Sequence, residues 1–491
     1  MYFQSVLKSF VSRSKANGLL AILLLPVLLP WQNAAAEPSS LEIATSEIAP
    51  PALSLPAVAV VAAPAPEDLP NQYTAITKKI LLCGVDLERF SLHFRLESGK
   101  QPKLRRLRYF GAQETGAACG LAFEITGDQQ FGLGRRHPLQ VSKPVLHRAL
   151  ATATIGSTIA GAGSCLELGL NGMQAIKNMQ HGYDRESAAT TGIAKLKFLD
   201  ELLAQREALV AAHPEIPGYE RAVAEGKIYK QMRECFVDEY ARFNYDTAGY
   251  AAFQNVFFSL NAAYNAIGAA GAGVAYRAVK TPHLNGTANI LFTISGGMAA
   301  VSPLVSTMAG KFARDHASHV LNRRLGEEPH FDPDAFTASC KALQDMPHTG
   351  EGSMIPLLPA TERLALYTQS DKLFREQFES ETVVMRRLEK VALENSLLGP
   401  LIGGQLMTQG ILGTVGYYRY TIRPRKQLSM YYRGSVVGTV GTSMAVLGNA
   451  AWFASSLAYE HKLSKEKRLP RQLIETRLAH LDDIEKSLNA L

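Results

Sequence analysis

Long stretches with almost no charged residues are the main pattern of the chain after residue 145. They run from Ala149 to Leu166, Thr247 to Tyr276, Leu284 to Gly310, Asn395 to Tyr418 and Gly434 to Tyr459. All but the first exceed the roughly 20 residues that a helix needs to cross a hydrocarbon core. They are rich in Gly, Ala, Ser and Thr, so each is only marginally apolar for insertion. The pattern predicts four or five membrane helices, and a soluble bundle with a small-residue core is the alternative.

Glycines in these stretches recur at spacings that suit close helix packing. Gly399 and Gly403 are four residues apart, as are Gly434 and Gly438. In lipid, helices gain nothing from excluding water from one another, so small residues that let two backbones approach stabilise their contact. These four glycines are therefore candidates for helix packing.

One motif occurs twice. The sequence GAAGAGVAYR from Gly268 to Arg277 matches GILGTVGYYR from Gly410 to Arg419, and Pro282 then aligns with Pro424. Duplication of a helical hairpin explains the match, with chance resemblance between glycine-rich helices as the alternative. Gly268, Gly271, Gly410 and Gly413 join the packing candidates. Tyr276, Arg277, Tyr418 and Arg419 are predicted interfacial anchors, because Tyr and Arg at a helix end suit the membrane surface.

Residues 73–140 show a different periodicity. In SLHFRLE, Leu92, Phe94 and Leu96 alternate with His93 and Arg95, and further short apolar runs follow between glycines. A period of two is typical of a half-buried strand. The pattern predicts a small antiparallel β domain, with His93 facing solvent.

Charged helical segments separate the apolar stretches. Two of them carry leucine stripes, LKFLDELLAQREALV and LIETRLAHLDDIEKSLNAL, which need a packing partner within the chain or outside it. The predicted fold is therefore mainly α, with duplicated membrane hairpins and amphipathic extensions. The expected organisation is a signal peptide (1–36), an Ala/Pro-rich linker (37–72), the β domain (73–140), a helical region with the first candidate span (145–246), the first hairpin (247–330), an amphipathic linker (331–394) and the second hairpin with a C-terminal helix (395–491).

The amino terminus has the features of a bacterial secretory leader. A basic start precedes the apolar run from Leu19 to Leu29, and Ala34 to Ala36 form a small-residue cleavage site. An uncleaved anchor is the alternative. In an oxidising compartment, Cys83 and Cys119 are candidates for a disulfide, with two free thiols as the other interpretation.

Composition and motifs exclude several functional classes. The chain has 491 residues, of which 47% are hydrophobic and 19% charged, and its net charge of +7 is spread along the sequence, so nucleic acid is not an expected partner. No cofactor or catalytic signature is present, and the best metal candidate, Asp315 with His316 and His319, lacks a further carboxylate. We expect a protein without enzymatic activity.

Polar residues within the apolar stretches leave two interpretations open. Glu167 alone is charged, and an ionisable residue there would mark an ion or substrate path. The neutral polar residues either line a pore or form interhelical hydrogen bonds. They are Gln254, Asn255, Asn261, Asn265, Gln405, Gln409 and Asn449.

These patterns indicate an exported membrane protein of the bacterial cell envelope, placed in the inner membrane with its β domain in the periplasm. Its expected role is structural or in assembly, with the lipid bilayer as partner and with protein partners or self-association through the amphipathic helices. A solute transporter or channel is the first alternative, and would require Asn261, Asn265 and Gln409 to face one wet cavity. A soluble periplasmic bundle is the second. Basic residues at both ends of the hairpins leave the orientation open.

Overall fold

The computed structural model describes residues 69–99, 104–215, 218–346 and 400–490, and these ranges are helical almost throughout. The signal peptide, the Ala/Pro-rich linker and most of the 331–394 linker lie outside the described residues. The α-helices are α3 (Leu69–Ser98), α4 (Arg105–Arg136), α5 (Lys143–Gln180), α6 (Arg185–Ala211), α7 (Tyr219–Ala278), α8 (Asn285–Leu325), α9 (Pro333–Asp345), α11 (Pro424–Lys465) and α12 (Pro470–Ala490), with residues 400–420 forming another helix. Short 3₁₀ turns, η2 (Pro138–Gln140) and η3 (Pro282–Leu284), follow α4 and α7.

The predicted β domain is wrong, because the described part of 73–140 contains no strand and consists of α3, α4 and η2. In α3, Leu92, Phe94 and Arg95 are all buried, while His93 is exposed. The short alternation arises because α3 is enclosed on more than one side, by α6, α7 and α12. A helical period was present over the longer window, since buried positions recur at Tyr73, Thr77, Ile80, Gly84, Leu87, Ser91 and Arg95.

Polar caps and prolines set several helix boundaries. The Asp184 carboxylate accepts hydrogen bonds from the backbone N–H groups of Glu186 and Ser187 at the start of α6, and Asp332 caps α9 in the same way. Pro424 occupies the first turn of α11, where its missing N–H costs no helical hydrogen bond. These local signals divide the chain into long helices joined by short turns.

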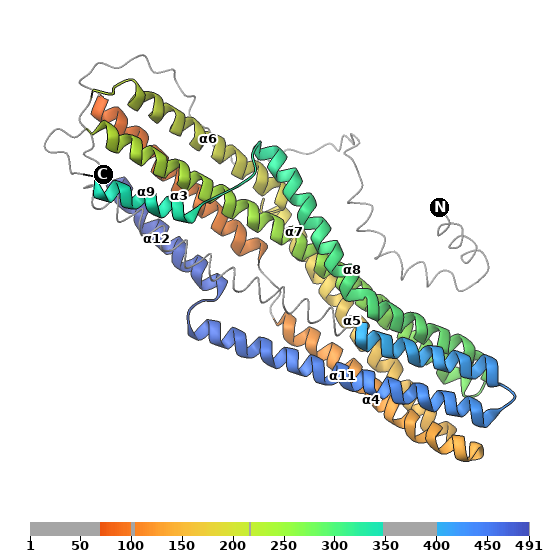
Figure 1. The fold of residues 1–491 in the computed structure, drawn as a ribbon. Helices are drawn as coiled ribbons and strands as arrows, with labels where there is room; N and C mark the ends of the chain where they lie inside the picture. The colour runs from red at the N-terminus through yellow and green to blue at the C-terminus, as the bar shows by residue number, and fades with distance from the viewer. Residues whose placement is uncertain (1–68, 100–103, 216–217, 347–399, 491) are drawn as a thin grey trace.

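The helices form an elongated structure with two parts (Figure 1). At one end, α3, α6, α9, α12 and the first half of α7 form a bundle rich in ion pairs, called the ion-paired bundle below. At the other end, α4, α5, the second half of α7, α8, the 400–420 helix and α11 form the glycine-rich bundle. The 60-residue α7 runs through both parts.

Large apolar side chains fill the core of the ion-paired bundle. The leucine stripe of α6 packs with that of α12 and with residues of α3 and α7, so both amphipathic helices find their partners within the chain. The core includes Leu199, Leu203, Ile228, Leu481 and Leu488, all at most 7% exposed. Phe94 and Tyr240 belong to a second cluster at its border with α8.

The glycine-rich bundle consists of three helical hairpins. In addition to the two expected hairpins, α7–α8 and 400–420–α11, α4 and α5 form a third hairpin, whose first helix was predicted to belong to the β domain. Pro138, Pro282 and Pro424 mark the three turns. Gly127, Gly271 and Gly413 precede these prolines at the same distance along the chain. The architecture is therefore a threefold repetition of one hairpin.

The six helices of these hairpins contact one another in a closed order. Within the described residues, α4 contacts α5, α5 contacts α7, α7 contacts α8, and α11 returns to α4. The 400–420 helix closes the ring, because Gly403 lies against the backbone of Ala300 in α8 and Gln409 lies against Gly434 in α11. Phe123 of α4 and Phe292 of α8 approach each other, with ring centroids 6.5 Å apart.

Polarity in the glycine-rich bundle is opposite to that in the ion-paired bundle. The buried residues of α11 are Gly434, Ser435, Gly438, Gly441, Thr442 and Leu463, whereas many of its large apolar side chains face outward. Three described stretches are long and apolar enough to cross a membrane: Lys143–Ala211, Pro282–Leu325 and Pro424–Asn489. The protein therefore has apolar helices compatible with a membrane location.

Candidate functional site

The strongest candidate site is a buried carboxyl group in the glycine-rich bundle. Glu124, near the middle of α4, is 4% exposed. The Nε2 of Gln409 donates to its two carboxyl oxygens at 2.6 and 2.7 Å, and the hydroxyl of Ser435 lies 3.3 Å from Oε2. Glu124 thus joins α4 to the 400–420 helix and to α11 without forming an ion pair among the described residues.

A glycine creates the space for this carboxyl group. A Cβ added at Gly438 of α11 would lie 2.7 Å from both Cδ and Oε2 of Glu124. That separation is too short for a real contact, so any larger residue would displace the carboxyl group or separate α4 from α11. Gly438 was a packing candidate from its spacing, and the structure shows what packs on it.

A second acid lies one turn further along α4. Asp128 Oδ2 accepts a hydrogen bond from the Thr439 hydroxyl at 2.7 Å, while the buried Oδ1 has no hydrogen-bond partner. Glu124 and Asp128 are on the same face of α4, because residues four apart lie one above the other on a helix. We define the Glu124 cluster as Glu124, Asp128, Gln409, Ser435 and Thr439.

A separate polar cluster lies where α4, α5 and α7 meet. Glu167 is 1% exposed and forms ion pairs with Arg108 at 2.9 Å and Arg105 at 3.3 Å. Two arginines therefore neutralise Glu167, which directly follows the first apolar stretch and was the charged candidate for an ion or substrate path. The pairing of Glu167 explains how a carboxylate is tolerated there, because burying a charge is costly without a partner.

The neutral polar residues mostly join helices. Asn261 of α7 donates to the Tyr109 hydroxyl at 2.9 Å and accepts from the Ser164 hydroxyl at 2.9 Å. Asn255 accepts from Asn171 of α5 at 3.0 Å. The Nε2 of Gln405 lies 3.7 Å from the Met444 sulfur of α11. These contacts are the interhelical bonds that formed one of the two interpretations.

The residues proposed to share a wet cavity are separated. Asn265 donates to Asn261 within α7, on the side that faces α5. Gln409 instead faces Glu124, at the contact with α4 and α11. Asn261, Asn265 and Gln409 therefore do not face one shared cavity, which the transport alternative required.

The other packing candidates lie at helix contacts. A Cβ at Gly403 or Gly410 would overlap the backbone of α8, and one at Gly413 would overlap the Asn289 side chain. Gly268 lies 3.1 Å from the Ser295 hydroxyl and Gly271 lies 3.2 Å from Leu291, both distances being measured from the added Cβ. Gly399 is outside the described residues.

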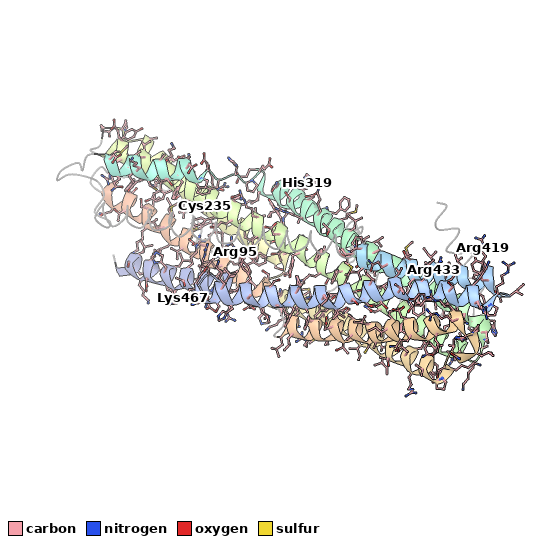
Figure 2. All side chains as sticks on the ribbon, turned by 60° about the horizontal axis from the view of Figure 1, so that its bottom comes forward. Arg95, Cys235, His319, Arg419, Arg433 and Lys467 are labelled. Atoms are coloured by element: carbon pink, nitrogen blue, oxygen red, sulfur yellow. The ribbon has the colours of Figure 1, made fainter. Side chains whose placement is uncertain are left out.

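The four predicted anchors lie at the hairpin-turn end of the bundle. Tyr276 and Arg277 are exposed at the end of α7, and Tyr418 and Arg419 are exposed at the end of the 400–420 helix. Figure 2 shows Arg419 and Arg433 at this end of the molecule, and Arg95, Cys235 and Lys467 in the opposite half.

The ion-paired bundle contains a buried network that the sequence analysis did not predict. Arg477 of α12 bonds to Glu88 of α3 and to Glu239 of α7, and Glu239 also pairs with Arg95 at 3.3 Å. Burial lowers the pKa of Arg477, but the two carboxylates outweigh this effect and raise it overall. The network fastens α12 to α3 and α7. Its members are far apart in sequence, so no local pattern marks them.

The cysteines and histidines do not assemble a site among the described residues. All five cysteines are free, so the candidate disulfide between Cys83 and Cys119 is not formed in the structure. Cys83 lies near the backbone of α6, whereas Cys119 lies against Gly156 of α5. His316 and His319 are exposed, and the described part of the chain contains no group of three or more metal-ligating side chains.

Comparisons with protein-family models, with curated proteins and with solved structures found no match to the chain.

Proposed function

We propose that the protein is an integral membrane protein of the bacterial cell envelope with a structural or assembly role. The glycine-rich bundle would anchor the chain in the bilayer, and the ion-paired bundle would stand in water and contact other proteins. The observation that carries this proposal is the distribution of polarity, with small and polar residues between the helices and large apolar residues outside. In water this arrangement would be unfavourable, because apolar surface is stabilised by removal from water.

Burial values support lipid as the solvent of the glycine-rich bundle. Only 22% and 17% of the most apolar windows in Pro282–Leu325 and Pro424–Asn489 are buried within the protein. Ile290, Ile294, Leu304 and Leu447 are examples of exposed side chains, at 41–70% exposure. A soluble monomer would not be expected to expose so many large apolar side chains on its longest apolar helices.

The close glycine contacts favour a scaffold over a moving transporter. Gly249 and Gly310 place α7 and α8 so close that a Cβ at either position would lie 3.0 Å from the other residue's carbonyl oxygen. Similar contacts occur between α8 and the 400–420 helix. Helices in such contact gain dispersion energy that separation would lose. A rigid anchor is the function that this packing supports best, and we propose no enzymatic activity for it.

Carbonate extraction of membranes tests the membrane location. The full-length chain is expected to stay in the pellet at high pH and to enter solution only with detergent. A peripheral protein of the same membranes is the control, and carbonate should release it. A monodisperse chain in aqueous buffer without surfactant would refute the membrane proposal and leave the soluble periplasmic bundle.

Two further measurements test the envelope and assembly parts. Amino-terminal sequencing of the mature chain is expected to begin at Glu37, after the leader. Native electrophoresis of membranes solubilised in mild detergent should give a species larger than a single mature chain with its detergent. A mature chain that keeps residue 1 would contradict export through a cleaved leader. A chain that stays monomeric in every mild detergent would contradict the assembly role.

Transport of a proton or small cation is the second candidate, and the Glu124 cluster is the observation that favours it. An acid buried between membrane helices without a cationic partner is a functional hypothesis by default. The test is proton uptake by proteoliposomes containing a pH-sensitive dye. Under this candidate Glu124→Gln abolishes uptake, whereas Glu460→Gln, at an exposed ion pair with Arg106, retains it. Uptake no faster than in empty liposomes contradicts this candidate.

A further inference from the structure

The turns of the three hairpins carry an excess of positive charge at one end of the glycine-rich bundle. The residues are Arg135, Arg136, Lys143, Arg148, Arg277, Lys280, Arg419, Arg423, Arg425, Lys426 and Arg433. All eleven are exposed. The sequence contains no Asp or Glu within 129–166, 247–314 or 400–459, the ranges that include these turns. We call this surface the basic cap.

The basic cap has no anionic partner among the described residues. None of its eleven side chains forms an ion pair there. Two of them instead lie over tyrosine rings, Arg135 over Tyr432 at 4.6 Å and Arg419 over Tyr420 at 5.8 Å. The charge of this end is therefore available to an external anion.

The opposite end of the same helices is different, because it also contains acids and several of its cations pair with them. Arg106 bonds to Glu460 at 2.5 Å, and Arg314 to Asp246 at 3.1 Å. Further along, Lys462 and Arg468 both lie 3.9 Å from Glu466. Both ends contain many basic residues, but acids that can compensate them, such as Asp246, Glu460 and Glu466, lie at the end opposite the hairpin turns.

Aromatic side chains accompany the basic cap. Tyr276 and Tyr418 are 43% and 64% exposed, next to Arg277 and Arg419. Exposed apolar residues such as Ile290 and Ile411 lie on the adjoining helix turns. This order along the helix, from apolar to aromatic to basic, is that of a segment passing from hydrocarbon through the headgroup layer into water.

We propose that the basic cap binds the headgroups of anionic phospholipids and faces the leaflet that contains them, with the ion-paired bundle on the other side of the membrane. The cations are exposed and spread over three turns, so they match a layer of many headgroups better than one dissolved anion. Basic residues of short loops also favour the cytoplasmic side. The inference rests on the proposed membrane location.

Lipid retention by the purified full-length chain tests the proposal. The chain in dodecyl maltoside is given equal amounts of dioleoyl phosphatidylglycerol and dioleoyl phosphatidylcholine, and the bound lipids are counted by native mass spectrometry. We expect several-fold preferential retention of the anionic lipid, decreasing as NaCl is raised because salt screens exposed charges. Equal retention of the two lipids overturns the proposal.

Matched triple variants locate the site. Arg423→Gln, Arg425→Gln and Lys426→Gln together remove three cations from the third turn, and should cut retention of the anionic lipid at least twofold. Lys462→Gln, Lys465→Gln and Arg468→Gln remove three cations from the other end of α11 and should leave it unchanged. Equal losses in both variants overturn the proposal. If the turn variant is not monodisperse, Arg425→Gln alone replaces it, with Lys465→Gln as its control.

Inorganic phosphate distinguishes a free anion from a lipid. The anionic lipid should raise the midpoint of thermal unfolding more for the wild-type chain than for the turn variant. Inorganic phosphate at matched ionic strength should not raise the midpoint of either chain. A phosphate effect of the same size would assign the cap to dissolved anions and overturn the lipid proposal. Carbonate-resistant protein without lipid preference would refute only this inference. Protein that is soluble without detergent would refute the membrane location itself.

Discussion

Glu124 and Gln409 are 285 residues apart in the sequence, yet the Gln409 amide lies 2.6 and 2.7 Å from the two carboxyl oxygens of Glu124. The contact links the first and third hairpins, and its surroundings include Ser435 and Gly438 from the second helix of the third hairpin. The contact therefore helps to hold the first and third hairpins together in the ring of helices that forms the glycine-rich bundle.

Replacement of Glu124 by Leu should destabilise the folded protein. The change leaves the half-buried Gln409 amide without its acceptor, and an unpaired buried donor typically costs about 1–3 kcal/mol. Glu124→Gln keeps the shape and an acceptor oxygen, so its effect should be smaller. Thermal unfolding in detergent measures both. A double-mutant cycle with Gln409→Leu should give a coupling energy of at least about 0.5 kcal/mol, and strict additivity would contradict a direct interaction.

Two adjacent glycines provide a test of helix packing. Gly403→Leu would force a side chain into the backbone of α8 at Ala300, whereas Gly404 has no atom within 4 Å of an added Cβ. We expect Gly403→Leu to lose about 1–3 kcal/mol or more through overpacking and Gly404→Leu to behave like wild type. Yield and thermal stability in detergent compare the pair.

The sequence-based candidates Gly271 and Gly413 allow a second comparison. Gly413→Leu should be the more damaging, because its Cβ would overlap Asn289, whereas Gly271 meets side chains at 3.2 Å that can shift slightly. Gly273→Leu is the control within α7, since its surroundings are open. Wild-type stability in all three variants would refute close packing at these positions.

The buried network around Arg477 should be essential for docking α12. Arg477→Met leaves Glu88 and Glu239 without this shared cation, and breaking a buried pair in this way typically costs about 3–5 kcal/mol. Arg471→Met, in an exposed pair with Glu475, should have little effect. Limited proteolysis should release α12 early only in the Arg477 variant. Equal resistance in the two variants would show that apolar packing alone holds the helix.

Cys83 should react slowly in the folded protein. Burial, together with the nearby Asp86 carboxylate, raises the pKa of its thiol to about 11. Because the thiolate is the reactive form, alkylation at pH 8 should be about a hundredfold slower than for an ordinary thiol. Mass spectrometry of peptides after timed alkylation measures the rate. A thiol titration of the chain denatured without reductant should count five free thiols. A count of three would indicate that the disulfide between Cys83 and Cys119 is formed.

The same thiol predicts a direction for stability at high pH. The folded state raises the pKa above that of the unfolded chain and so holds the proton more tightly. The free energy of unfolding should consequently fall as the pH rises from about 9 to 11. Cys83→Ala should reduce this slope compared with wild type, and an unchanged slope would assign it to other groups.

Topology reporters should place all three hairpin turns on one side of the membrane. Fusions or insertions near Pro138, Pro282 and Pro424 are expected to report the cytoplasm, and one after α12 the opposite side. If the turns near Pro282 and Pro424 gave opposite signals, the hairpin arrangement would not hold in the membrane.

Local repetition made two hairpins visible in the sequence. The Gly and Tyr-Arg motifs near Pro282 and Pro424 lie within short windows, so their alignment needs no knowledge of contacts. The first helix of the first hairpin was predicted to be part of a β domain, and Glu114, Glu124 and Asp128 interrupt the apolar pattern that would have marked it as a membrane helix. These acids are accommodated by residues of helices about 300 positions away, such as Ser435 and Thr439. A one-dimensional pattern contains no sign of that accommodation.

Helix α3 shows a different limit. Its alternation around Leu92 and Phe94 is produced by burial on several sides, and a window of seven residues cannot distinguish that from a strand. The helical repeat of buried positions from Tyr73 to Arg95 includes Thr77, Ser91 and Arg95, so only part of it is visible in the sequence as an apolar pattern. The ion pairs of Arg95 and Arg477 depend on three helices meeting, and so lie beyond sequence periodicity altogether.

Helix α7 continues without interruption from one bundle into the other over 60 residues, a length of about 90 Å. Such a rod transmits rotation and tilt along its axis, because its backbone hydrogen bonds leave no hinge in between. Under the proposed membrane location, a tilt of the glycine-rich bundle would therefore displace the far end of α7, because the helix is continuous between the two bundles.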